Sequence, residues 1–142
     1  MIPFGQANLV HEGKDMTIVS CGRMVHVAKD AALALAKDGI GCDVIDLRTT
    51  SPLDEDAILD SLEVTGRLVV VDESNPRCSL ATDIAAFAAQ HAFSSLKAPT
   101  QLVTAPHSPV PFARELERAY LPDAGKIDAA VRRVMDYRSG AV

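Results

Sequence analysis

Polar and charged residues stand where the predicted strands of this sequence end, and they are the first candidates for chemistry. In an open parallel sheet, ligands usually bind beyond the carboxyl ends of the strands. The residues at these positions are Cys21, Arg48, Asp72, Glu73 and His107. One interpretation is a crevice that combines an acid pair, a base and a cation. The other is that these residues are polar only because a chain must turn where a strand ends.

The four histidines differ in their surroundings. His107 lies in the proline-rich segment 105–111, which fixes its position, and it is the best candidate for a functional histidine. His91 continues the apolar stripe of a predicted helix, so we expect it to pack or to contact a partner. His26 falls on the solvent face of a predicted helix and His11 on an edge strand. No two histidines have the spacing of metal ligands, and we predict no metal site.

Two further features could carry chemistry but lack the residues that would complete a site. Cys78 follows Arg77 and precedes a predicted helix, a position that favours the thiolate. No neighbouring residue supplies the base that a catalytic cysteine needs, so we expect a small, buried or half-buried thiol. Gly22 opens a strand-to-helix turn, but no glycine-rich phosphate motif surrounds it. We therefore predict no catalytic and no cofactor-binding residue in this chain.

Short β-rich runs alternate with longer helical stripes, and this alternation predicts an α/β fold. The expected strands are residues 7–12, 16–20, 42–47, 67–72 and 100–104. Residues 68–71 are continuously apolar, as in a strand covered on both faces, and belong at the centre of the sheet. Residues 7–12 alternate with polar side chains and are typical of an edge strand.

Five helices are expected between and after the strands. They begin after Gly22, at Asp54, near Ser79, around Phe112 and after Pro122. The fourth is a short amphipathic helix with Phe112, Leu116 and Tyr120 on one side. The whole order predicts a three-layer α/β/α sandwich with a five-stranded, mostly parallel sheet and right-handed crossovers.

The composition limits the function classes. The chain has 142 residues, which predicts one domain over residues 1–142. The formal net charge is −5, whereas nucleic-acid binders are typically basic, so a nucleic-acid-binding function is not expected. No apolar run approaches the ~20 residues of a membrane span, and no signal peptide is evident. The three widely spaced cysteines are typical of a reducing compartment, so we predict a cytoplasmic protein.

Several segments together carry a more specific signal than any single residue. They are residues 46–49 with 51–54, residues 66–73, the Ala-Pro-His-Ser-Pro-Val-Pro-Phe run at 105–112, and residues 116–122. In this order they resemble the C-terminal domain of transketolase-type thiamine diphosphate enzymes. The resemblance is closest to the beta subunit of the decarboxylating component of 2-oxo acid and acetoin dehydrogenase complexes. Residues 76–79 and the Ala-Pro-His-Ser-Pro loop resemble acetoin-type or related oxidoreductase subunits more than pyruvate ones. The resemblance covers the chain from Ile2 to about Val134.

The resemblance implies a mixed sheet whose first strand is antiparallel to the others. It also implies that thiamine diphosphate and magnesium are bound in the intact enzyme by a separate subunit or domain with a GDG motif. The aminopyrimidine ring of the coenzyme would be held by the domain that precedes this one. This sequence has no GDG motif and begins where that pyrimidine-binding domain would end, so we expect no coenzyme site within it.

The expected function is subunit association. We expect the domain to pack against its own symmetry mate, the alpha subunit or the acyltransferase core, through apolar helix surface and the proline loop. The residues expected at such an interface or strand-end site are Arg48, Asp72, Glu73, His91, His107, Phe112 and Tyr120. Many relatives have an acidic residue at the position of Lys97, in a region that can help to dock the acyltransferase core. The alternative hypotheses are a free-standing interaction module and a small-anion site around Arg48 and His107.

Overall fold

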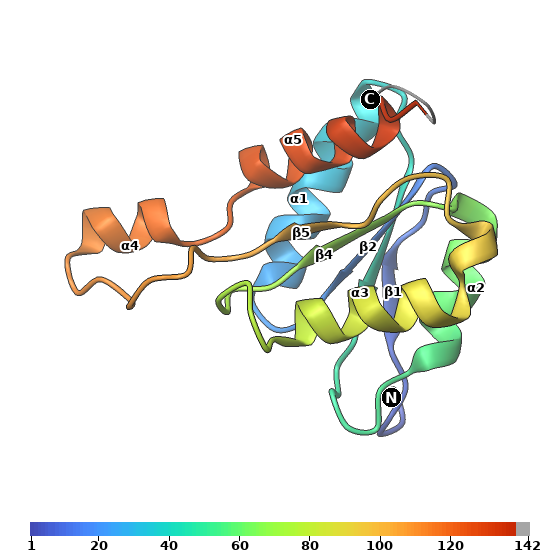
Figure 1. The fold of residues 1–142 in the computed structure, drawn as a ribbon, viewed down its shortest axis with the longest axis horizontal. Helices are drawn as coiled ribbons and strands as arrows, with labels where there is room; N and C mark the ends of the chain where they lie inside the picture. The colour runs from blue at the N-terminus through green and yellow to red at the C-terminus, as the bar shows by residue number, and fades with distance from the viewer. Residues whose placement is uncertain (139–142) are drawn as a thin grey trace.

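The computed structural model describes residues 1–138, and its centre is a five-stranded sheet (Figure 1). The strands are β1 Asn8–His11, β2 Met16–Ser20, β3 Cys42–Asp46, β4 Leu68–Val71 and β5 Gln101–Val103. Their order across the sheet is β1-β3-β2-β4-β5. β1 runs antiparallel to β3, and the other neighbouring pairs are parallel. The predicted mixed sheet with an antiparallel edge strand is confirmed.

Helices cover both faces of this sheet and make the three predicted layers. They are α1 Met24–Lys37, α2 Glu55–Thr65, α3 Leu80–His91, α4 Arg114–Tyr120 and α5 Ala124–Met135, with a single 3-10 turn, η1, at Phe93–Ser95. In Figure 1, α1 and α5 lie on one face of the sheet, and α2 and α3 lie on the other. Within residues 1–138, none of these helices combines the length and apolarity that crossing a membrane requires.

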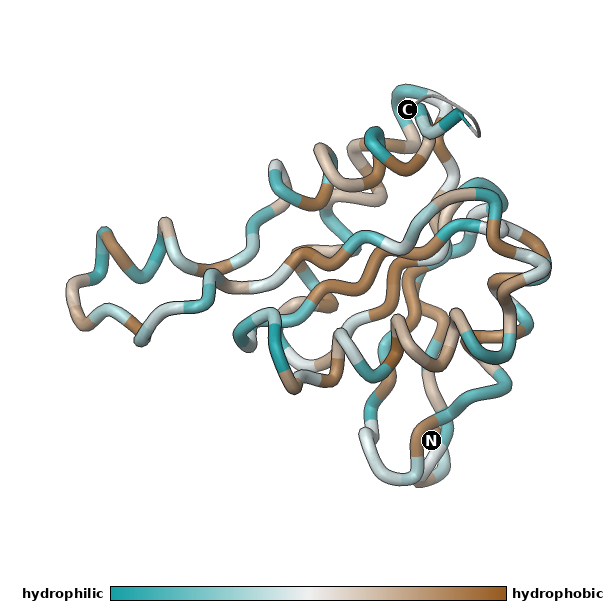
Figure 2. The backbone as a smooth tube through the Cα atoms, viewed as in Figure 1, coloured by the Kyte–Doolittle hydropathy of each residue, from teal (hydrophilic) through white to brown (hydrophobic). Residues whose placement is uncertain are grey.

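The central strands β2 and β4 are buried along their whole length because both of their faces are covered. Alternate side chains of each strand enter opposite cores. Ile18 and Val69 pack in the core beneath α1 and α5, whereas Val19 and Val70 pack in the core beneath α2 and α3. Figure 2 shows the hydrophobic character of the central strands. Each such side chain contributes roughly 1.5–3 kcal/mol on burial, so these strands fix the sheet.

Side-chain hydrogen bonds set where α2 and α3 begin, and a glycine sets where α2 ends. The Asp54 carboxylate accepts from the Ala57 backbone N–H at 3.1 Å, so Asp54 caps α2. Ser79 and Thr82 form a capping box at the start of α3. α2 ends at Gly66, whose left-handed φ of 67° closes the helix.

A chain of buried polar groups ties α2 to the sheet. The Thr17 hydroxyl lies 2.7 Å from the hydroxyls of both Ser61 and Thr65. The Ser61 hydroxyl donates to the Asp43 carboxylate at 2.6 Å, and the Gly13 N–H donates to its other oxygen at 2.8 Å. Because buried polar groups must be satisfied, this network fixes the position of α2 over β2 and β3.

Residues 105–123 form an arm that projects from the sheet and carries α4 at its far end (Figure 1). Tyr120 is the one buried residue of α4, and its hydroxyl donates to the Ser108 carbonyl at 3.1 Å. The expected helix begins later than predicted, at Arg114, because Pro109 and Pro111 hold the preceding chain extended. Phe112 therefore lies outside the helix and is fully exposed.

Candidate functional site

The carboxyl ends of β2, β3 and β4 meet at one edge of the sheet because these strands are parallel. Cys21 follows β2, Asp46 ends β3, and Asp72 follows β4. Burial raises the pKa of the half-buried Cys21 thiol, and the charges of Asp72, Asp46 and Glu73 raise it further. Cys21 and the predicted acid pair therefore lie near one another at this edge of the sheet, together with a third carboxylate from β3.

Arg48 lies at the same edge, and it contacts Asp46, the last residue of the strand that it follows. It has a left-handed φ of 61°, and its backbone N–H donates to an oxygen of the Asp46 carboxylate at 3.1 Å. Its guanidinium lies 3.8 Å from the other oxygen and is 54% exposed. An ion pair this exposed contributes little energy, about 0–1 kcal/mol. Arg48 offsets one of the three carboxylates and leaves this edge of the sheet acidic.

Asp72 supports the turn that follows β4. Its carboxylate accepts from the Ser74 hydroxyl at 2.5 Å and from the Ser74 backbone N–H at 3.1 Å. Its own backbone N–H donates to the Val103 carbonyl at 3.0 Å. Glu73 is exposed at the tip of this turn. These contacts favour the interpretation that the acid pair serves to turn the chain.

His107 is exposed in the proline-rich segment and lies beside a different hollow. That hollow has a volume of about 300 Å³ and is lined by Asn75, His107, Ser108 and Pro109. No strand-end charge lines it. The base and the cation of the predicted constellation are therefore not gathered in one cavity of the described chain.

The chemistry open to the strand-end residues follows from their charge. Three carboxylates around Cys21 disfavour the thiolate that nucleophilic catalysis requires. The same carboxylates repel a diphosphate group. Across residues 1–138, no group of three or more His, Cys, Asp or Glu side chains is placed to hold a metal ion. These strand ends therefore offer no complement to a diphosphate with magnesium, the group that the family resemblance assigns to a separate subunit or domain.

The remaining predicted residues lie on the surface or at the base of the arm. His91 ends α3 and is exposed, with its ring centroid 4.8 Å from that of Phe87. Phe112 and Tyr120 belong to the arm, where Phe112 is exposed and Tyr120 is buried. The expectation of a buried or half-buried Cys78 is wrong, because the turn before α3 holds it at a φ of 48° outside both cores.

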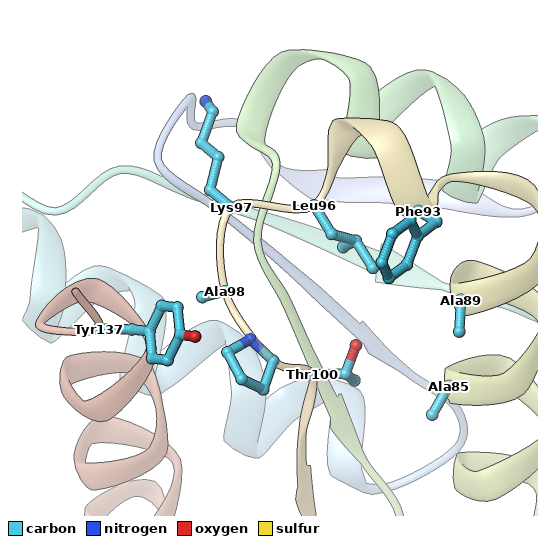
Figure 3. A pocket seen from close by; sticks show the side chains of 9 residues that line it. Ala85, Ala89, Phe93, Leu96, Lys97, Ala98, Thr100 and Tyr137 are labelled. Atoms are coloured by element: carbon cyan, nitrogen blue, oxygen red, sulfur yellow. The ribbon is translucent and has the colours of Figure 1, made fainter. Parts of the chain in front are cut away.

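An apolar cavity of about 560 Å³ lies between α3 and the end of the described chain, and sequence patterns do not reveal it (Figure 3). The residues that line it are Ala85, Ala89, Phe93, Leu96, Lys97, Ala98, Pro99, Thr100 and Tyr137. Phe93 is 77% exposed and Tyr137 is 46% exposed, so their rings are open to a partner. The only local sequence signal for this cavity is Phe93, an aromatic residue shortly after the end of α3.

The family model described as "Transketolase, C-terminal domain" matches residues 5–127 of the chain. The chain belongs to the transketolase C-terminal domain family. The segments that suggested this resemblance all fall within the matched residues.

This transketolase C-terminal domain is similar to beta subunits of larger enzymes. It is 58% identical over 134 residues to the acetoin:2,6-dichlorophenolindophenol oxidoreductase subunit beta of Cupriavidus necator, covering 94% of the chain and 40% of the relative. It is 52% identical over 126 residues to the subunit of the same name from Bacillus subtilis, covering 89% of the chain and 37% of the relative. The pyruvate dehydrogenase E1 component subunit beta of Rickettsia felis is 43% identical over 136 residues, with coverage of 96% and 42%. The chain thus spans about 40% of the length of the first of these relatives.

Solved structures agree with the fold. A structure titled "Split gene transketolase, inactive beta4 tetramer" matches with a TM-score of 0.79 and 27% identity, over 92% of this chain and 41% of that chain. A 2-oxoglutarate:ferredoxin oxidoreductase from Magnetococcus marinus matches with a TM-score of 0.59 and 11% identity, over 92% and 19%, which bears on the fold alone.

Proposed function

We propose that this chain is the C-terminal subunit-association domain of the beta subunit of a thiamine diphosphate-dependent 2-oxo acid or acetoin dehydrogenase. Identity of 58% and 52% to two acetoin oxidoreductase beta subunits supports this assignment. The domain is catalytically incomplete alone, because the carboxylates at its strand ends, Asp46, Asp72 and Glu73, repel a diphosphate. In the intact enzyme, thiamine diphosphate and magnesium are bound outside residues 1–142, by the pyrimidine-binding domain and the alpha subunit.

The arm is the observation that carries the proposal. Three of its apolar side chains face solvent, with exposed fractions of 69% for Val110, 105% for Phe112 and 59% for Leu116. The arm lies away from both cores and gains nothing from burying these groups against its own chain. Exposed apolar groups on a projecting segment mark a surface that another protein covers. The arm therefore serves association.

Two partners follow from the assignment. A beta subunit pairs with an alpha subunit and with its own symmetry mate, and the solved relative whose title describes a beta4 tetramer supports contact between copies. Covering the arm's apolar groups on such contact contributes favourably to assembly. We assign the arm to these subunit contacts.

The apolar cavity beside Phe93 and Tyr137 suits a third partner, the acyltransferase core (Figure 3). Its open aromatic rings can receive an apolar side chain. The Lys97 ammonium donates to the Thr65 backbone carbonyl at 3.2 Å and points away from the cavity, so the docking segment of the core would present apolar side chains. All three cysteines are free thiols, and we place the protein in the reducing cytoplasm.

Sedimentation velocity tests the proposal, with the chain alone and mixed with the alpha subunit and the pyrimidine-binding domain of its own enzyme. We expect a larger assembly on mixing, and neither decarboxylase turnover nor tight thiamine diphosphate binding by the chain alone. Turnover by the isolated chain would contradict the assignment. A chain that binds neither partner would instead be a free-standing interaction module.

A further inference from the structure

A cavity of about 320 Å³ lies between the start of α1 and the inner face of α4. It is lined by Arg23, Arg114, Glu117, Arg118 and Leu121. Arg114, Glu117 and Arg118 are spaced by three and four residues and share one face of α4, and Leu121 directly follows the helix. Arg23 reaches the same cavity from the body of the domain, where it immediately precedes α1.

The positive charge of this cavity is not neutralised within the described chain. The ion pairs among residues 1–138 involve Arg48 and Arg132, and none involves the three arginines of the cavity. The first turn of α1 contains no acidic residue. Glu117 is the one carboxylate that lines the cavity, so three positive charges and one negative charge leave an excess of two. This excess contrasts with the net charge of −5 of the whole chain.

Three exposed arginine side chains line one small space, and an anion between them would offset the repulsion of their positive charges. Arginine cannot relieve the repulsion by losing its proton. A carboxylate has two oxygens and is satisfied by one guanidinium fork, whereas a phosphoryl group presents at least three oxygens to several forks. We propose that Arg23, Arg114 and Arg118 bind the phosphoryl group of a small ligand, either inorganic phosphate or a phosphate monoester.

A phosphoryl group in this cavity would join the arm to the body. Arg114 and Arg118 belong to α4, whereas Arg23 adjoins α1. The contacts that hold α4 to residues outside it are few, since Tyr120 is its one buried residue. Occupancy of the cavity therefore restricts the direction in which the arm projects, and this consequence holds whichever partner the arm meets.

Amide NMR spectra of the isotope-labelled chain test the site, with inorganic phosphate and glycerol phosphate as probes at an ionic strength held constant with chloride. We expect saturable shifts for residues 23–25 and 114–121 with dissociation constants in the millimolar range. The Arg118→Gln variant should bind each probe at least about fivefold more weakly, given the strength of hydrogen bonds to charged groups. Arg133→Gln removes the same charge from exposed α5 surface and should leave binding unchanged.

Several results would overturn the proposal. They are shifts that do not saturate, shifts spread over all arginines, and equal affinity in the Arg118→Gln variant. A tetraglutamate peptide that binds more tightly than phosphate would assign the cavity to an acidic segment of a protein instead. The unchanged core amide shifts of each variant verify its fold, and Arg114→Gln repeats the test at a second position on α4.

Discussion

A substitution at Phe112 should change the association of the domain with its partners and leave the stability of the isolated domain almost unchanged. The side chain is 105% exposed and contacts neither core, so Phe112→Ala should change the free energy of unfolding of the isolated chain by less than about 0.5 kcal/mol. If a partner covers the ring, its burial contributes roughly 1.5–3 kcal/mol to association. That energy corresponds to a loss of about 10- to 150-fold in the association constant of the variant.

Urea unfolding measures the first quantity, and sedimentation equilibrium of the chain mixed with its partner subunits measures the second. Leu33→Ala provides the control, because Leu33 is 48% exposed on α1, in the body of the domain, and should affect neither quantity. An association constant that Phe112→Ala leaves unchanged would refute the assignment of the arm. A loss of more than about 1 kcal/mol in stability would show that the ring packs against its own chain.

Three further predictions concern the fold. Gly66→Ala should destabilise the domain by at least about 2 kcal/mol, because its left-handed φ and a backbone oxygen 2.7 Å from the new Cβ both oppose it. Gly22→Ala, with a similar φ and no atom within 4 Å, should cost only about 1 kcal/mol in the same urea titration. Burial and two neighbouring carboxylates raise the pKa of the Cys42 thiol from 9.0 to about 12. The unfolded chain therefore loses this proton first, and stability should fall from pH 9 toward pH 12 by up to ~1.4 kcal/mol per pH unit, a slope that Cys42→Ala should reduce. Ser61→Ala leaves one oxygen of the buried Asp43 carboxylate without its donor and should cost about 1–3 kcal/mol, and an unchanged unfolding midpoint would count against the buried network.

The local elements of the fold could be predicted from the sequence because their signals are local. The continuous apolar run 68–71 predicted a central strand, and it forms β4 with both faces covered. Asp54 and Ser79 marked helix starts because their side chains cap free backbone N–H groups. The arm was predicted less well. Its prolines were recognised, yet Phe112 was placed in a helix that begins only at Arg114.

The candidate site could be predicted only in part. The rule for parallel sheets correctly brought Cys21 and Asp72 to one edge, because parallel strands end on the same side. It did not show that Asp46 joins them, nor that His107 lies beside a separate hollow. Those outcomes depend on how the turns after each strand fold, and turn conformation depends on contacts made across the chain.

The sequence by itself determined the class of the fold, the approximate positions of the strands and of the helices outside the arm, and the family, since hydrophobic period and ordered motifs are properties of the chain alone. Only the tertiary structure decided which distant residues meet. The path of the arm sets Arg114 and Arg118 opposite Arg23, and no periodicity relates two segments so far apart along the chain. Exposure of Phe112 was likewise decided in three dimensions, because an apolar side chain is buried only where another surface lies against it.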